Sequence, residues 1–462
     1  MSSFVPEKLT GLRLKTPVEF VNAMPTLTNA IANSRNGFND SHFGGDPQRW
    51  LTVFARDPTN SILVVSCSTS RDVSLTSERE MTDSKKCALC SDTLSAKNKT
   101  KEHVIPNAIG GRKKTTEFIC NDCNNKLGRS WDADLARQLN WFSLAVGISR
   151  ERGESPRQVV QTIAGDKYWL LNDGSLTPEK SSYLEEDLGG KIKISLTAKT
   201  VEEAKQRLKG IARKYPKFDI EKAMSELEVA TNYLDSPLHV SLSLGGANAG
   251  RSLVKTAFAF ASECGVPHSQ CEKALEYLIN PEAEAIPFGF AYLSDLVEGR
   301  PKDRIFHCVS LHGDSKKKRL WSYIEYFGIF RIVVLLSDQY GGPDRNEIYT
   351  IDPISGERVA AKVRSQVSEE EFSSLMKGNG FDQEKHKAAA DYALPIILDR
   401  SRSRSLERSV KEGFDHAAKQ LGIKENEIIP KEKAAKFTGL MMEKISPFIE
   451  HLVRNGRRNG RS

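Results

Sequence analysis

The sequence predicts an α+β protein of several domains, with a small cysteine-rich module inserted between a small N-terminal region and a larger α+β domain. Its 462 residues allow two to four domains with a well-buried core. Strand-like and helix-like stretches are interspersed with hairpins, which favours α+β over a doubly wound sheet. Two Cys-x-x-Cys pairs enclose the module. We expect the boundaries at 1–80 (N-terminal region), 81–140 (module), 141–364 (α+β accessory domain for substrate binding or sensing) and 365–462 (helical, basic C-terminal region).

The composition is that of an ordinary globular protein, with 39% hydrophobic and 27% charged residues. No apolar run is long enough for a membrane-spanning helix, so no membrane association is expected. The first residues lack a basic head followed by an apolar stretch, which argues against a secretory signal. We therefore expect a cytoplasmic protein with reduced cysteines.

The N-terminal region is expected to contain a helix within Pro17–Ile31 and a strand over Ser61–Cys67, and it holds no catalytic pattern. After the module, apolar spacing predicts one amphipathic helix over Ser130–Val146. A hairpin is expected from Gln158–Ile163 and Lys167–Leu171, around a Gly-Asp turn.

The accessory domain continues with further alternating patterns. Strands are expected at 191–196, 238–244, 305–311, 320–326, 330–337 and 347–351, and helices at 202–215 and 251–263, with a mostly helical segment from 365 onward. Arg251 and Lys255 share one face of a helix and could contact DNA, although solvation is the expected state. His307 and His312 are expected in core or surface roles. The Arg-Ser stretch from Arg400 to Arg404 suggests either weak nucleic-acid affinity or a solvated face.

The four cysteines of the two pairs are the candidate metal ligands. Two Cys-x-x-Cys units about thirty residues apart can fold back around one Zn²⁺, each pair chelating from a single turn. In a reducing compartment, such pairs are typical of metal sites rather than disulfides. We expect a structural Zn²⁺ with no open coordination position, held by Cys87, Cys90, Cys120 and Cys123.

Between the pairs, Glu102 and His103 end a short strand, Gly110-Gly111 allow a turn, and Thr115–Ile119 is expected to return as a second strand. Asn124 is expected near the start of a helix, where phosphate binds favourably. A zinc-pinned hairpin and helix would bring Glu102, His103 and Asn124 close together. The simpler alternatives are a structural histidine, a surface carboxylate and a helix cap.

The positive charge of the module also suggests a nucleic-acid partner. Residues 81–130 hold ten Lys or Arg against five Asp or Glu, so they contribute +5 of the whole chain's +7. A compact basic segment suits a polyanion such as nucleic acid, although a solvated basic loop would give the same count.

These residues, in this order and spacing, resemble the HNH endonuclease family with its ββα-metal fold, in the branch flanked by zinc-binding cysteine pairs. The matching pieces are Glu102-His103-Val-Ile-Pro106, Gly110-Gly111 and Cys120-x-x-Cys123-Asn124, followed by Leu127-Gly128. They cover roughly 45 residues, about a tenth of the chain.

The resemblance implies metal-dependent hydrolysis of DNA phosphodiester bonds. His103 would be the general base, since an imidazole titrates near pH ~6.5. Glu102 and Asn124 would bind one Mg²⁺ or Mn²⁺ through oxygen, as hard cations prefer. Double-stranded DNA is the expected substrate. Basic residues that could contact its phosphates, or be merely solvated, are Arg112, Lys113, Lys114, Lys126 and Arg129.

One position departs from the family. Its middle asparagine, which ties the loops around the base, is replaced by Thr115 or Thr116, and Asn107 is another candidate for that task. A non-catalytic, zinc-stabilised nucleic-acid-binding module therefore remains the alternative. A redox role for the cysteine pairs is weaker, because it would not need Glu102 and His103. By analogy alone, a restriction or anti-phage role is suggested, with a homo-oligomer or defence-system proteins as partners.

Overall fold

The computed structural model describes residues 85–462 apart from 190–191, 227–232, 235, 241–242, 281, 284, 425–426 and 460–462. The N-terminal region 1–80, including the helix expected within Pro17–Ile31 and the strand expected over Ser61–Cys67, lies outside the described residues. The described residues combine helices and sheets, which confirms the α+β class. The domain boundaries stay a prediction.

A five-stranded antiparallel sheet forms the main core, with strand order β14-β11-β12-β13-β9. Its strands are β9 (Phe288–Phe290), β11 (His307–Asp314), β12 (Arg319–Tyr326), β13 (Phe330–Ser337) and β14 (Arg345–Ile351). Four of these strands confirm the patterns read between residues 305 and 351. Both faces of the central strands are buried: Ile332 and Val334 face the larger apolar core, and Val333 and Tyr323 face a smaller one.

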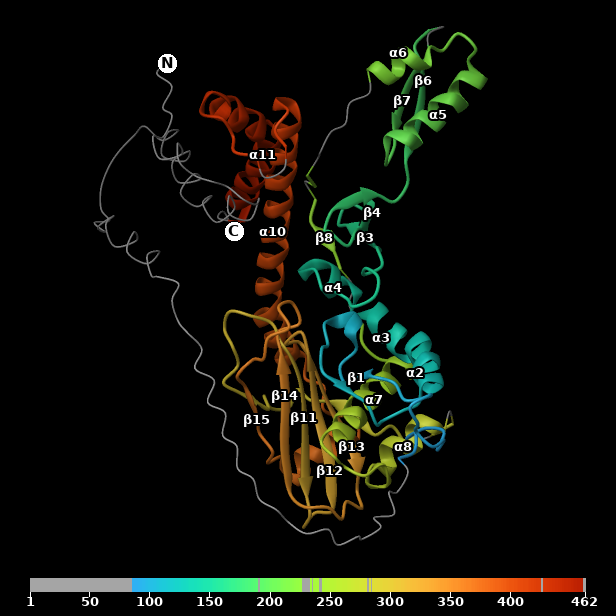
Figure 1. The fold of residues 1–462 in the computed structure, drawn as a ribbon, viewed down its shortest axis with the longest axis vertical. Coiled ribbons are helices and arrows are strands. Elements are labelled where there is room, and N and C mark those ends of the chain that lie inside the picture. The colour runs from blue at the N-terminus through green and yellow to red at the C-terminus, as the bar shows by residue number, and fades with distance from the viewer. Residues whose placement is uncertain are drawn as a thin grey trace, which may run out of the picture. The chain divides into compact units, whose positions relative to one another are not determined.

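Helix α7 (Ala247–Glu263) packs between this sheet and the cysteine-rich module (Figure 1). It contacts strands β11, β12 and β13, and on the module side it contacts the segments before and after helix α2 (Asn121–Leu127). Thr256 lies 3.0 Å from the Tyr326 hydroxyl on the sheet side. On the module side, the rings of Phe258 and Phe118 meet edge to face at 5.1 Å. A helix that is buried on two sides is apolar nearly all round, as this one is.

The module itself begins with a short antiparallel pair, β1 (Glu102–His103) and β2 (Lys114–Thr115), in which Glu102 lies opposite Thr115. The second strand is shorter than the predicted Thr115–Ile119. Phe118 and Ile119 instead enter the core, where the Phe118 ring packs on α7, so the chain turns out of the ladder after Thr115.

The prediction of one continuous helix over Ser130–Val146 is wrong. The structure has a π-helical turn at Gly128–Asp132, then α3 (Ala133–Gln138) and α4 (Asn140–Val146). Leu139 separates the last two with a non-helical backbone, yet its side chain is fully buried. The apolar residues are therefore buried as their spacing predicts, but that spacing does not reveal the break in the helical backbone at Leu139.

The loop between β1 and β2 is fixed to the sheet by a buried histidine. His307 Nδ1 accepts a hydrogen bond from the backbone N–H of Phe327 at 3.0 Å, so Nε2 carries the proton and donates to the Ile109 carbonyl at 2.7 Å. Burial lowers the pKa of His307 to about 4, which keeps the ring neutral. Gly110 next to it has φ 101°, and a Cβ there would lie 2.6 Å from Pro353. His307 is thus a core residue, as is His312, which stacks on Trp321.

The remaining strands form small sheets. A four-stranded sheet has the order β5-β4-β3-β8, and β6 pairs with β7 in a two-stranded sheet. Their bounds, with those of the nearby helices, are β3 (Gln158–Thr162), β4 (Lys167–Leu170), β5 (Leu176–Pro178), β6 (Ser182–Asp187), β7 (Ile192–Thr197), α5 (Val201–Lys214), α6 (Ile220–Ser225), β8 (Leu238–His239), α8 (Glu272–Ile279), β10 (Val297–Glu298) and β15 (Lys362–Val363). The hairpin predicted around the Gly-Asp turn is confirmed as β3 and β4, whereas the strand predicted at 238–244 shrinks to two residues.

The C-terminal region is helical as predicted, with α9 (Glu369–Met376), α10 (Gln383–Leu421) and α11 (Lys431–Asn459). Helices α10 and α11 pack side by side, with Phe414 and Phe437 edge to face at 5.2 Å (Figure 1). Among the residues that the structure describes, no helix combines the length and apolarity that crossing a membrane requires.

The Arg-Ser stretch has a structural task in α10. Arg404 donates to the carbonyls of Leu144 at 2.5 Å, Ala145 at 3.2 Å and Asn172 at 2.7 Å. Two of these carbonyls belong to the last turn of α4, where they have no partner within the helix. Arg404 therefore joins α10 to α4, so neither interpretation offered for the stretch, a solvated face or a nucleic-acid contact, fits this residue.

Replacing Arg404 with alanine should destabilise the protein by about 2 kcal/mol, because three carbonyl oxygens lose their donor. Exposed Arg402, two residues away in the same helix, is the matched control, and its change to alanine should alter stability by less than about 0.5 kcal/mol. Urea denaturation followed by circular dichroism measures both. Equal midpoints for the two variants would contradict the bridging role.

Candidate active site

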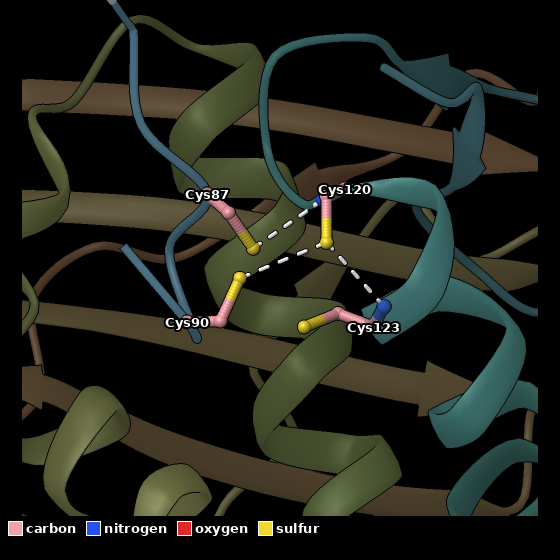
Figure 2. Close-up of side chains that lie close together, drawn as sticks. All are labelled: Cys87, Cys90, Cys120 and Cys123. Atoms are coloured by element: carbon pink, nitrogen blue, oxygen red, sulfur yellow. Dashed lines mark hydrogen bonds between the residues drawn. The ribbon is translucent and has the colours of Figure 1, made fainter. Parts of the chain in front are cut away.

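The four predicted zinc ligands come together at one end of the module. Cys87 and Cys90 lie in a turn before β1, Cys120 is the N-cap of α2, and Cys123 lies in its first turn. Figure 2 shows the four thiols gathered at one place, and their sulfur atoms all lie within 4.8 Å of one another. Backbone N–H groups donate to two of them, from Cys120 to the Cys87 sulfur at 3.3 Å and from Cys123 to the Cys120 sulfur at 3.4 Å.

This geometry fits a zinc ion. A tetrahedron with Zn–S bonds of 2.3 Å has S···S edges of about 3.8 Å, and the sulfurs of Cys90 and Cys120 are 3.7 Å apart. Four sulfurs complete the shell, so such an ion would have no free position for a substrate. Its role would be to hold the turn before β1 against the start of α2.

Glu102 and Asn124 approach each other next to this cluster. Glu102 is 6% exposed, and Asn124 lies close enough for its amide to lower the pKa of that carboxyl. The Asn124 Nδ2 donates to the hydroxyl of Thr100 at 3.1 Å, which leaves its carbonyl oxygen available to a cation. Asn124 is not the cap of α2, since that position belongs to Cys120. The strand and the helix thus bring these two side chains together, and their role as cation ligands stays a prediction.

A buried lysine from α7 also reaches Glu102. Lys255 Nζ lies 2.5 Å from Glu102 Oε1 and also forms an ion pair with Asp132. Its side chain is fully buried, so the expectation that Lys255 is solvated is wrong. Asp132, in the π-helical turn after α2, has Lys255 and the Ser252 hydroxyl as partners, and the hydroxyl lies 2.6 Å from Oδ1.

The charges in this cluster do not balance. Burial lowers the pKa of Lys255, but the carboxylates of Asp132 and Glu102 outweigh that effect and raise the pKa above its usual value. The lysine therefore stays charged. Two carboxylates then face one ammonium, and burial raises the pKa of Glu102 despite Lys255. The excess negative charge is of the kind that a bound cation would neutralise.

His103 is held by a carboxylate outside the module. Its Nε2 lies 3.2 Å from Glu151 Oε1, and the other Glu151 oxygen accepts from Lys114 Nζ at 2.7 Å. Burial lowers the pKa of His103 below its ordinary value, although Glu151 opposes the shift. The ring is therefore neutral at pH 7, with Nε2–H donating to Glu151 and Nδ1 left as a base. The pKa of Glu151 falls to about 2, chiefly through its hydrogen bonds from Lys114 and His103.

Asn107 connects the loops that surround this histidine. Its Nδ2 donates to the Gly111 carbonyl at 3.1 Å, and its Oδ1 accepts from the backbone N–H of Glu151 at 2.8 Å. Thr115 is buried opposite Glu102, and Thr116 is exposed. Of the three candidates for the loop-tying position, Asn107 is the one with contacts to two loops.

The five basic candidates fall into two groups. Lys113 pairs with Glu263 at 2.8 Å and Lys114 with Glu151, so both are engaged within the protein. Arg112 is partly exposed near Gly356, while Lys126 and Arg129 are exposed on and after α2. The latter three are the ones whose side chains are open to a phosphate.

Comparison with known proteins agrees with this geometry. Residues 87–140 match the HNH endonuclease family. The resemblance inferred from the residues is thereby confirmed for this segment, and the match indicates a nuclease-type function that acts on nucleic acid. No curated protein and no solved structure matches the chain.

Three residues around the candidate site were not predicted from the sequence: Lys255, Asp132 as its partner, and Glu151. Lys255 gave one usable signal, because it is the one charged residue in the mostly apolar stretch from Leu253 to Ala261, where a charge needs a buried partner. Glu151 gave none, since it follows the helical segment in a polar loop with no pattern around it.

The cysteine cluster predicts about one zinc ion per purified chain. Cys123→Ser should release it and lower the thermal stability, because the turn before β1 is then no longer tied to α2. Cys271→Ala is the matched control, since Cys271 is a buried cysteine elsewhere in the core. Elemental analysis by mass spectrometry measures the zinc content. A chain purified without metal, or equal zinc content in both variants, would contradict the assignment.

Proposed function

We propose that this protein is an endonuclease that hydrolyses DNA phosphodiester bonds with the help of one divalent cation. The observation that carries the proposal is the arrangement within the HNH segment: an uncharged histidine with a free ring nitrogen lies one residue from a carboxylate that meets an asparagine. These are the base and the two oxygen donors that such hydrolysis needs. Restriction or anti-phage defence is the biological role inferred by analogy with stand-alone proteins of this family.

His103 acts as the general base. Nδ1 takes the proton from the attacking water, and the positive charge that forms on the ring is stabilised through Nε2–H by Glu151, as an orienting carboxylate does in a catalytic triad. Asn107 holds Glu151 in place through the backbone N–H. In this proposal Asn107 takes over the loop-tying task of the family's middle asparagine.

Glu102 and Asn124 would hold the divalent cation, and the unbalanced negative charge at Glu102 fits that role. Mg²⁺ or Mn²⁺ would supply Lewis-acid stabilisation of the pentacovalent transition state and of the departing 3′ oxygen. Arg112, Lys126 and Arg129 would contact the flanking phosphates of a double-stranded substrate.

The test incubates the purified protein with supercoiled plasmid and Mg²⁺ or Mn²⁺. His103→Ala should reduce cleavage about 10²- to 10⁴-fold, the usual contribution of a general base. Zinc content and DNA affinity should not change. The exposed histidine His239, on β8, provides the control, and its change to alanine should leave cleavage intact.

Cleavage that persists in His103→Ala would mean that the base is misassigned. If the wild-type protein binds DNA but shows no metal-stimulated cleavage, the alternative of a non-catalytic zinc-stabilised binding module is favoured. Occupation of Glu102 Oε1 by Lys255 is the feature of the structure most compatible with that alternative.

The rate of cleavage should also depend on pH in a defined direction. Since burial lowers the pKa of His103, kcat/KM should rise through a pKa below about 6.5 and level off above it. Glu151→Gln removes a carboxylate that raises this pKa. The variant should therefore show a pH profile displaced to lower pH and a lower plateau. A displacement to higher pH would show that Glu151 does not stabilise the protonated ring.

A further inference from the structure

We infer that Lys255, on helix α7 outside the HNH segment, is a positioning residue that fixes the Glu102 carboxylate for the divalent cation. This inference rests on the proposed function and deepens it, because it extends the site beyond residues 87–140. The juxtaposition that carries it is an ammonium placed between two carboxylates, one from β1 and one from the π-helical turn after α2.

The contact leaves one side of Glu102 available. Lys255 engages Oε1 and does not occupy the second carboxylate oxygen, and the Asn124 side chain lies within hydrogen-bonding reach of the same carboxylate. A carboxylate with one oxygen fixed by a charged donor loses its rotational freedom, as metal ligands do when outer partners orient them. The free oxygen then needs little reorganisation to receive a cation.

Lys255 cannot easily leave this position. Its neighbours in α7, Val254 and Thr256, are fully buried, and Thr256 faces the Tyr326 hydroxyl on the sheet. Asp132 accepts from the ammonium with one oxygen and from the Ser252 hydroxyl with the other, so the lysine is held from a second side. A rigid contact of this kind can hold the Glu102 carboxylate in one orientation. It is not expected to open and close during the reaction.

The experiment measures Mn²⁺ binding to the full-length, zinc-saturated protein by the electron paramagnetic resonance signal of free Mn²⁺. Lys255→Met should weaken Mn²⁺ binding at least about tenfold, roughly 1.4 kcal/mol. Lys273→Met is the matched control: Lys273 lies on α8 and pairs with Asp338 at 3.1 Å, away from the site. That control should bind Mn²⁺ like the wild type.

A double-mutant cycle separates orientation from a general effect on structure. In a Glu102→Gln background, Lys255→Met should cause no further loss of Mn²⁺ affinity, because the lysine acts through the carboxylate. Equal losses in both backgrounds would overturn the inference. Unchanged or tighter Mn²⁺ binding in Lys255→Met alone would also overturn it, since it would make the lysine a competitor of the cation.

Removal of a buried charge can unfold a protein, so a milder variant completes the test. Asp132→Asn together with Ser252→Ala keeps Lys255 and Glu102 but releases the lysine on one side. It should weaken Mn²⁺ binding severalfold with normal zinc content, and unaltered affinity would count against the inference. Mn²⁺ binding that depends on Lys255 without any plasmid cleavage would retain this inference and refute the nuclease function.

Discussion

The two-sided burial of helix α7 is the constraint on which the rest of the described structure depends. One side of the helix packs on the five-stranded sheet, and the other packs against the HNH segment. Because the middle of the helix is buried, a charged side chain placed there must find its partners inside the protein. Lys255 finds them in Glu102 and Asp132, so packing of the core and geometry of the site depend on the same element.

A second connection runs from the sheet to the loop of the HNH segment. The neutral ring of His307 on β11 joins the turn between β12 and β13 to the Ile109 carbonyl. Phe142 on α4 stacks on Phe327 with ring centroids 5.0 Å apart. Together with α7, these contacts make the accessory region a support for the loop that carries Asn107, and so for the loop contacts around His103.

The sequence was informative where chemistry depends on local spacing. Two cysteine pairs, a Glu-His pair and a Gly-Gly turn each lie within a few residues, so the clustering of the four cysteines and the short β1 strand could be predicted. The four long strands between residues 305 and 351 were also readable, because their apolar runs are bounded by turn residues. The second HNH strand was overestimated, since β-branched and aromatic residues at 115–119 serve the core instead of a ladder.

The rest depended on contacts between residues far apart in the chain. Lys255 meets Glu102 across 153 positions, and Arg404 meets Leu144 across 260. No local pattern encodes such partners, and a lysine or arginine in a helix is ordinarily solvated. Glu151 belongs to the same class, because only the fold of the loop brings it to His103.

The contact between Lys255 and Glu102 has a consequence for how such a segment could be exchanged between proteins. A shuffled gene that inherited residues 87–140 alone would receive the four clustered cysteines and the Glu-His pair, but it would lack Lys255, the charged partner of Glu102. In a new host, the Glu102 carboxylate would face solvent and would no longer be oriented by a buried ammonium. Successful recombination would therefore have to include α7. Otherwise the new host would have to place a lysine or arginine side chain from another helix beside Glu102.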